Sequence, residues 1–79
     1  MRMPGKVYNR VEELIALRKR TNPDMPTSYR DIGKTVGMTP TTVGAWVNNE
    51  VKRFDKDKLV AWCDFLDCDL HDLLIYERE

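Results

Sequence analysis

The chain has 79 residues, of which 42% are apolar and 33% charged. These values fit one small globular domain and exclude a disordered tail. No apolar run approaches the ~20 residues that a transmembrane helix needs, and no signal-peptide pattern is present. We therefore expect a cytoplasmic protein with no membrane partner.

The net charge is zero, but the charges are unevenly distributed along the chain. Through Arg53 there are ten Lys or Arg against five Asp or Glu, and from Phe54 onward three against eight. This separation predicts a basic working surface and an acidic surface elsewhere.

The sequence offers little for metal binding or catalysis. Cys63 and Cys68 are its two cysteines and His71 its single histidine, so a four-ligand zinc site is not supported. We expect reduced, partly buried thiols, which a spacing of five would place on different sides of a helix. No nucleophile–base pair or glycine-rich phosphate loop is present, so the chain is not expected to be an enzyme or to bind a cofactor.

Helical signals dominate, and an all-α domain of five helices is predicted. Residues 9–12 have the form of a capping box, which predicts a helix over 9–20. Two prolines in 21–27 predict a loop. Ser28 as N-cap and Gly37 as left-handed terminator define a helix over 29–36.

The next helix is predicted to begin after Thr39 as N-cap, with Pro40 at its first position, and to run to about Asn48. Asp55 or its neighbour opens a helix with a broad apolar face. Asp69 with Asp72 caps the last helix, which is expected to carry Leu70, Leu73, Leu74 and Tyr76. No segment shows the alternation of a strand; residues 74–76 could be extended, but the run is too short to assign. The expected organisation is a flexible arm over 1–8, a domain over 9–76 and a short tail over 77–79.

Residues 28–49 meet the local demands of a helix-turn-helix, in which two helices cross closely. A small residue, Gly33, falls inside the first helix where the second passes, and Gly37 supplies the turn. The expected buried contacts come from Ile32, Val36, Met38, Val43 and Trp46.

The run from Val36 to Asn49, VGMTPTTVGAWVNN, and the later segment 57–74 resemble the phage lambda repressor/Cro-like (XRE) family. The resemblance covers about residues 8–75. It implies a five-helix DNA-binding domain of bacterial or phage transcription regulators, which bind operators as dimers. It also implies that Tyr29 touches a phosphate and that Asn48 bonds the DNA backbone. The groove-facing positions would be Thr39, Pro40, Thr41, Thr42, Gly44 and Ala45.

Two departures from the family pattern affect this transfer. Pro40 stands where the lambda repressor has a glutamine that bonds adenine, so that readout is absent. The loop between the first two helices is also longer than usual.

The side chains themselves point to the same chemistry. Thr41 and Thr42 offer hydroxyl and methyl groups to base edges or phosphates, and Ala45 can pack on a thymine methyl. Because strong bidentate groups are scarce, shape and phosphate contacts should contribute much of the binding. The expected phosphate partners are Ser28, Tyr29, Arg30, Asn48, Asn49, Lys52 and Arg53. Lys6 and Arg2 could add contacts from the arm.

The sequence thus predicts a regulator, of repressor type, that binds a double-stranded DNA operator as a homodimer. The dimer surface is expected on the last helix with residues 75–79. Two alternatives remain at this point: the antitoxin of a toxin–antitoxin pair, and a protein-interaction module that has lost DNA affinity. Either would add a protein partner.

Overall fold

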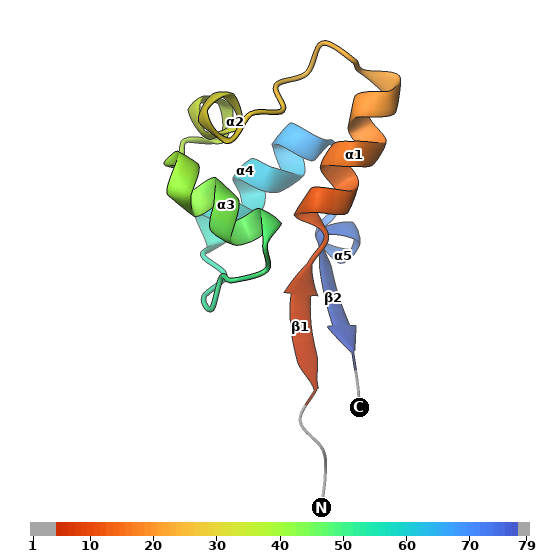
Figure 1. Cartoon of the computed structure of the whole chain (residues 1–79). Coiled ribbons are helices and arrows are strands. Elements are labelled where there is room, and N and C mark those ends of the chain that lie inside the picture. Colours follow the sequence, from red (N-terminus) through yellow and green to blue (C-terminus); the bar gives the residue numbers. More distant parts are fainter. Residues whose placement is uncertain (1–4, 78–79) are drawn as a thin grey trace, which may run out of the picture.

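A computed structural model describes residues 5–77 of the chain. The described part contains five helices and two short strands (Figure 1). In chain order these are β1 Lys6–Asn9, α1 Val11–Thr21, α2 Tyr29–Val36, α3 Pro40–Val47, α4 Lys56–Leu66, α5 Leu70–Leu73 and β2 Leu74–Glu77. No helix among these residues is long and apolar enough to span a membrane.

The starts of α2, α3 and α4 are capped by side chains, as the sequence predicts. Ser28 Oγ accepts a hydrogen bond from the Asp31 backbone N–H, and Thr39 Oγ1 accepts one from that of Thr42. Asp55 Oδ1 accepts from the N–H of Asp57. Each cap satisfies a donor that the first helical turn leaves unpaired.

The ends of the same three helices share one device. Gly37, Asn49 and Asp67 have left-handed φ angles of 74°, 56° and 50°. The next residue in each case donates its N–H to a carbonyl five residues back, at distances of 2.9, 2.8 and 3.0 Å. This is the hydrogen bond of the Schellman motif, and it turns the chain sharply after each helix.

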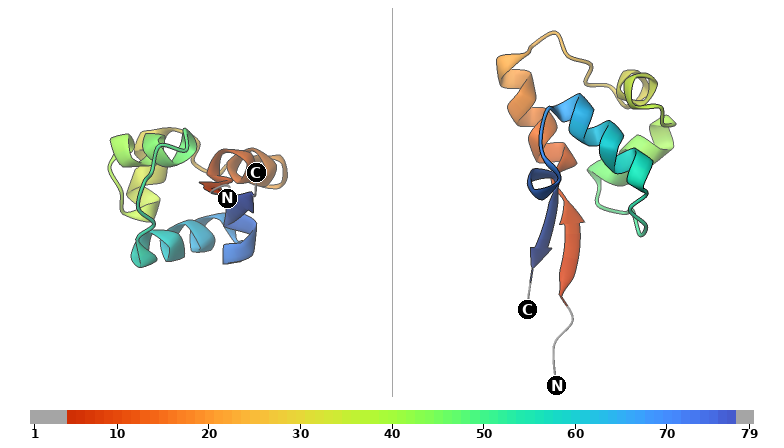
Figure 2. Two further views of the ribbon diagram at one scale, coloured as in Figure 1. Left: turned by 90° about the horizontal axis from the view of Figure 1, so that it is seen from below. Right: turned by 180° about the vertical axis from the view of Figure 1, so that it is seen from behind.

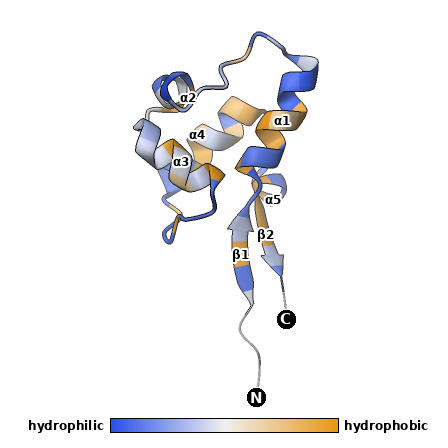
Figure 3. Ribbon diagram, in the orientation of Figure 1, coloured by the Kyte–Doolittle hydropathy of each residue, from blue (hydrophilic) through white to orange (hydrophobic). Residues whose placement is uncertain are grey.

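The core lies between α1, α2, α3 and α4, with α5 closing one end. Trp46 and Trp62 are fully buried at its centre, their ring centroids 6.0 Å apart, and Phe54 packs edge-on against Trp46 at 5.6 Å. Figure 3 shows apolar positions on α1, α3 and α4. The predicted buried positions of the helix-turn-helix are confirmed: Ile32, Val36, Val43 and Trp46 are buried, and Met38 packs against them.

The two strands are a difference from the predicted all-α fold. β1 and β2 pair antiparallel, with Val7 opposite Tyr76 and Tyr8 opposite Ile75, and the ribbon extends away from the helices (Figures 1 and 2). Lys6–Tyr8, expected in a flexible arm, belong to a strand, and Leu74 and Tyr76, expected in the last helix, lie in β2. β-branched and aromatic side chains favour this extended backbone. Arg2 lies outside the described residues.

The predicted start of the first helix is also wrong. Asn9 is not its N-cap: α1 begins at Val11, and the Asn9 side chain accepts a hydrogen bond from the Val11 N–H at 3.0 Å. The Arg10 N–H instead donates to the Leu73 carbonyl at 2.8 Å. Pairing with β2 holds Asn9 in extended backbone, so the helix starts two residues later than the pattern suggests.

Candidate nucleic-acid interface

The two helices of the motif, α2 and α3, meet at Gly33. A Cβ atom built on Gly33 would collide with the backbone carbonyl oxygen of Met38. The Met38 N–H donates to the Gly33 carbonyl at 2.9 Å across the turn. Glycine at this position therefore allows the close crossing that fixes how α3 projects from the body.

The exposed side of α3 forms one shallow depression, which we call the α3 depression. Six of the residues predicted to contact DNA line it, together with one acidic residue that was not predicted. They are Tyr29, Pro40, Thr41, Gly44, Ala45 and Asn48, with Glu50 as the seventh. Thr41, Ala45 and Asn48 recur at helical spacing, so they share the outward face of α3.

Tyr29 joins α2 to this surface. Its ring lies over Gly44, where a Cβ atom would come within 3.2 Å of the Tyr29 Cε2 atom. The Tyr29 side chain is nevertheless 41% exposed. The missing side chain at Gly44 thus makes room for a partly exposed aromatic ring beside α3.

Thr39 and Thr42 are already engaged with each other. Their hydroxyl oxygens are 2.9 Å apart and share one hydrogen bond, in addition to the cap that Thr39 provides. Thr42 is half-buried, whereas Thr41 is exposed and lines the α3 depression. Of the two threonines predicted to read bases, Thr41 is therefore the more available.

The predicted phosphate-binding residues come before and after α3 in the chain, and they are exposed. Ser28 caps α2, Arg30 lies in its first turn, and Lys52 and Arg53 follow α3 in the loop. Among the residues that the structure describes, none of the three cations takes part in an ion pair. They do not line the α3 depression itself.

Asn49 makes contacts that the sequence did not predict. Its side-chain oxygen accepts from the Asn9 backbone N–H at 2.7 Å, and its amide nitrogen donates to the Asn9 carbonyl at 3.1 Å. The oxygen and the nitrogen of the amide thus both bond the backbone of Asn9, the last residue of β1. The side chain thereby fastens the loop after α3 to the ribbon.

Glu50 is the lining residue that sequence reasoning missed. Asn49 adopts a left-handed conformation, and the Glu50 N–H then donates to the Ala45 carbonyl at 2.8 Å. This turn brings Glu50 back alongside α3. The signal in the sequence was Asn49, since asparagine is the usual substitute for glycine at such a helix end.

The two thiols lie beside each other, in contrast to the prediction that a helical spacing of five separates them. α4 ends at Leu66, and the chain turns at Asp67 so that Cys68 hydrogen-bonds Cys63. Burial raises the pKa of the Cys68 thiol to about 11, and also raises that of Cys63. Both thiols are therefore protonated at neutral pH, which makes them weak nucleophiles.

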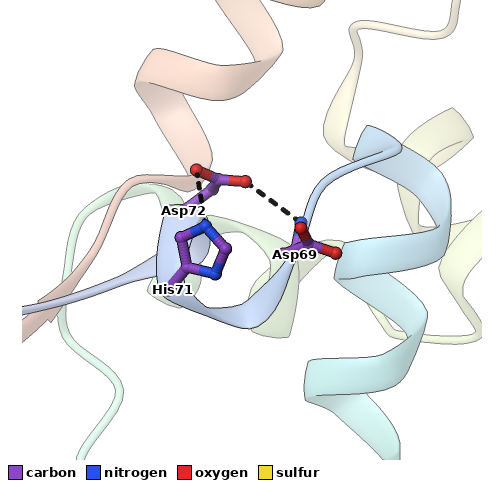
Figure 4. Close-up of side chains that lie close together, drawn as sticks. All are labelled: Asp69, His71 and Asp72. Atoms are coloured by element: carbon purple, nitrogen blue, oxygen red, sulfur yellow. Dashed lines mark hydrogen bonds and ion pairs between the residues drawn. The ribbon is translucent and has the colours of Figure 1, made fainter.

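Asp69, His71 and Asp72 place their ligand atoms within 4.8 Å of one another (Figure 4). The Asp72 carboxylate accepts from the Asp69 backbone N–H at 3.2 Å, and His71 Nε2 lies 3.7 Å from Asp72 Oδ1. The predicted capping of the last helix by Asp69 and Asp72 is confirmed by this bond. The cap explains why the Asp69 and Asp72 side chains lie close together.

These features define a helix-turn-helix DNA-binding domain. Two capped helices cross closely at a glycine, a left-handed turn joins them, and the second helix has an exposed outer face. The chain belongs to the Cro/C1-type helix-turn-helix DNA-binding domain family, whose model matches residues 10–79. No curated protein matches the sequence. The crystal structure of a candidate DNA-binding protein from Bacteroides fragilis is similar in fold, with a TM-score of 0.69 and 20% identity. The match covers 89% of this chain and 100% of that one.

Proposed function

We propose that this protein is a sequence-specific transcription regulator of repressor type, which places α3 in the major groove of an operator. The observation that carries the proposal is the α3 depression. It gathers six of the predicted contact residues from α2, α3 and the helix end onto one exposed surface. A helix presented in this way fits the major groove.

The chemistry of the depression favours modest direct readout. Pro40, Gly44 and Ala45 carry no side-chain hydrogen-bonding group, and Ala45 can pack on a thymine methyl. Thr41 and Asn48 supply hydrogen bonds to base edges or to the DNA backbone. Sequence preference would then come partly from these contacts and partly from the shape of the duplex.

Phosphate contacts would supply much of the affinity. Arg30, Lys52 and Arg53 are exposed cations without an ion-pair partner in the described part of the chain. Ser28 and Tyr29 at the start of α2 add a hydroxyl and backbone N–H groups, where the helix dipole also favours an anion. Asn49 is better assigned to holding the loop than to a phosphate.

A homodimer is part of the proposal, and an apolar groove beside α4 and α5 supports it. This surface keeps the last helix, where the dimer contact is expected from the sequence, but uses α4 in place of residues 75–79. Phe54, Leu59, Val60, Cys63 and Leu70 line this groove, with Val60 52% and Leu70 50% exposed. Lys56 and Asp64 also line it. If a two-fold axis runs perpendicular to α4 near Val60, the α4 helices of the two copies are antiparallel. Lys56 of each copy then lies beside Asp64 of the other, so the surface is complementary to itself.

Selection of bound duplexes from a random DNA pool tests the function. We expect enrichment of one two-fold symmetric site, bound with an affinity that falls steeply between about 50 and 200 mM salt. Repression is tested with a reporter gene whose promoter overlaps that site; we expect the protein to lower its expression. If no duplex is bound or enriched near the lower salt concentration, the proposal is wrong.

The dimer is tested separately by sedimentation of charge variants. Lys56→Asp and Asp64→Lys should each weaken self-association, because each creates like charges across the two-fold axis. The double variant restores opposite charges and should restore the dimer. Equal masses for all four proteins would contradict this surface.

A further inference from the structure

Glu50 is the acidic side chain on the α3 depression. It lines the surface together with Thr41, Ala45 and Asn48. Its side chain is exposed, and it has no hydrogen-bond or ion-pair partner among residues 5–77. A carboxylate on a surface built to approach polyanionic DNA lowers affinity unless it accepts a hydrogen bond there.

The position of Glu50 is fixed by backbone geometry. Its N–H donates to the Ala45 carbonyl at 2.8 Å, which closes the turn after α3. The preceding residue, Asn49, has φ 56° and is held by two side-chain hydrogen bonds to the Asn9 backbone. The backbone of Glu50 is therefore held in place, although Glu50 lies outside the helix.

The bases differ in what they offer an acidic side chain. In the major groove, guanine and the oxygen of thymine present acceptors, which repel a carboxylate, whereas cytosine presents the N4 amino donor. Adenine presents a donor beside the N7 acceptor, so its edge suits an amide better than a carboxylate. Cytosine is thus the base that an unpaired glutamate fits.

Few other groups on this surface can compete for that role. Pro40, Gly44 and Ala45 have no polar side-chain atoms, and the Thr42 hydroxyl is already bonded to Thr39. Thr41 and Asn48 are uncharged. We propose that Glu50 is a specificity-determining residue that selects a cytosine in each half of the operator; this rests on the proposed function, in which α3 occupies the major groove.

The test compares selections from one random duplex pool by the wild type, Glu50→Gln and Glu12→Gln. Glu12 is an exposed α1 residue without a partner in the described residues, so its substitution makes the same change of charge elsewhere. We expect the wild type and Glu12→Gln to enrich the same site, with cytosine at one fixed position. Glu50→Gln should lose this preference and favour adenine there, since an amide pairs with the adenine edge.

Direct titrations then quantify the effect. Replacing the selected cytosine should weaken wild-type binding by about tenfold, and Glu50→Gln should remove most of that difference. Melting curves confirm that the variants are folded. Glu50→Asp, which keeps the charge on a shorter side chain, should retain a weaker preference for the same base.

The outcomes separate the two hypotheses. If the wild type enriches no site, the proposed function fails and this inference fails with it. If the wild type and Glu50→Gln enrich the same site with the same base preferences, the inference is overturned and the proposed function stands. Uniformly tighter binding by Glu50→Gln to all sequences, with a salt slope changed by about one, would likewise overturn it, because Glu50 would then face a phosphate.

Discussion

Gly33 is the residue on which the crossing of α2 and α3 depends. Alanine normally stabilises a helix interior relative to glycine by about 1 kcal/mol. Here the added Cβ would meet the Met38 carbonyl oxygen, so the crossing must open. We expect Gly33→Ala to lower the free energy of unfolding by about 1–3 kcal/mol in urea titrations. Lys34→Ala, on the exposed side of the same helix, is the control; a more stable Gly33→Ala protein would refute the close approach.

Thr41 and Thr42 are neighbours with separable roles. Thr41→Ala removes an exposed hydroxyl from the α3 depression, so stability should change by less than about 0.5 kcal/mol. Binding to the selected operator should weaken by about 1 kcal/mol. Thr42→Ala also removes the hydrogen bond to Thr39, so stability should fall by about 0.5–1 kcal/mol. Thermal unfolding and fluorescence anisotropy measure the two effects, and equal losses of stability would contradict this division.

Helix boundaries show what the sequence could and could not predict at the scale of elements. α2 was predicted at its observed bounds because Ser28 and Gly37 are strong local signals. Asn49 and Asp67 perform the same task as Gly37 without being glycine, and their turns were not predicted. Those two turns place Glu50 and Cys68, so the missed geometry became a missed site residue and a wrong placement of the thiols.

The ribbon was missed for a different reason. β1 and β2 are the first and last elements along the chain, so no hairpin turn connects them. Each strand has four residues, too few for a clear alternation. A pairing between distant segments of this length depends on the helices that bring the strands together, and local patterns do not report it.

Asn49 connects the ribbon to the loop after α3 through two hydrogen bonds to Asn9. Their joint contribution to the free energy of unfolding can be measured. We expect Asn49→Gly to lose about 1–3 kcal/mol of stability, because glycine keeps the left-handed backbone but removes both bonds. Asn49→Ala should lose more, since alanine also strains that backbone. Chemical denaturation measures both variants. A glycine variant as stable as the wild type would show that the clamp contributes nothing.

For the whole molecule, the division of charge seen in the sequence has a partial counterpart in space. Asp64, Asp67, Asp69 and Asp72 line one hollow at the end of α4 and the start of α5. Arg18 approaches Asp67 at 3.6 Å, so one cation from α1 is used at that acidic end. The cations of α2 and of the loop after α3 carry no such pair in the described residues. The helix-turn-helix could be predicted from the sequence because its caps and its crossing are local, whereas the partner of each charge depends on the complete fold.

Salt dependence tests whether those cations meet phosphates. Each phosphate contact should contribute about −0.9 to the slope of log K against log salt concentration. Arg53→Gln and Lys52→Gln should each reduce the slope by about one and weaken binding equally for all sequences. Thr41→Ala should instead weaken binding to the operator while leaving the slope unchanged. Lys58→Gln is the control, since Lys58 lies on α4 and approaches Asp55 at 3.9 Å. Anisotropy titrations over a salt series measure the slopes; if Lys52→Gln and Arg53→Gln keep the wild-type slope, the DNA does not reach the loop after α3, and the orientation of the duplex on this domain must be revised.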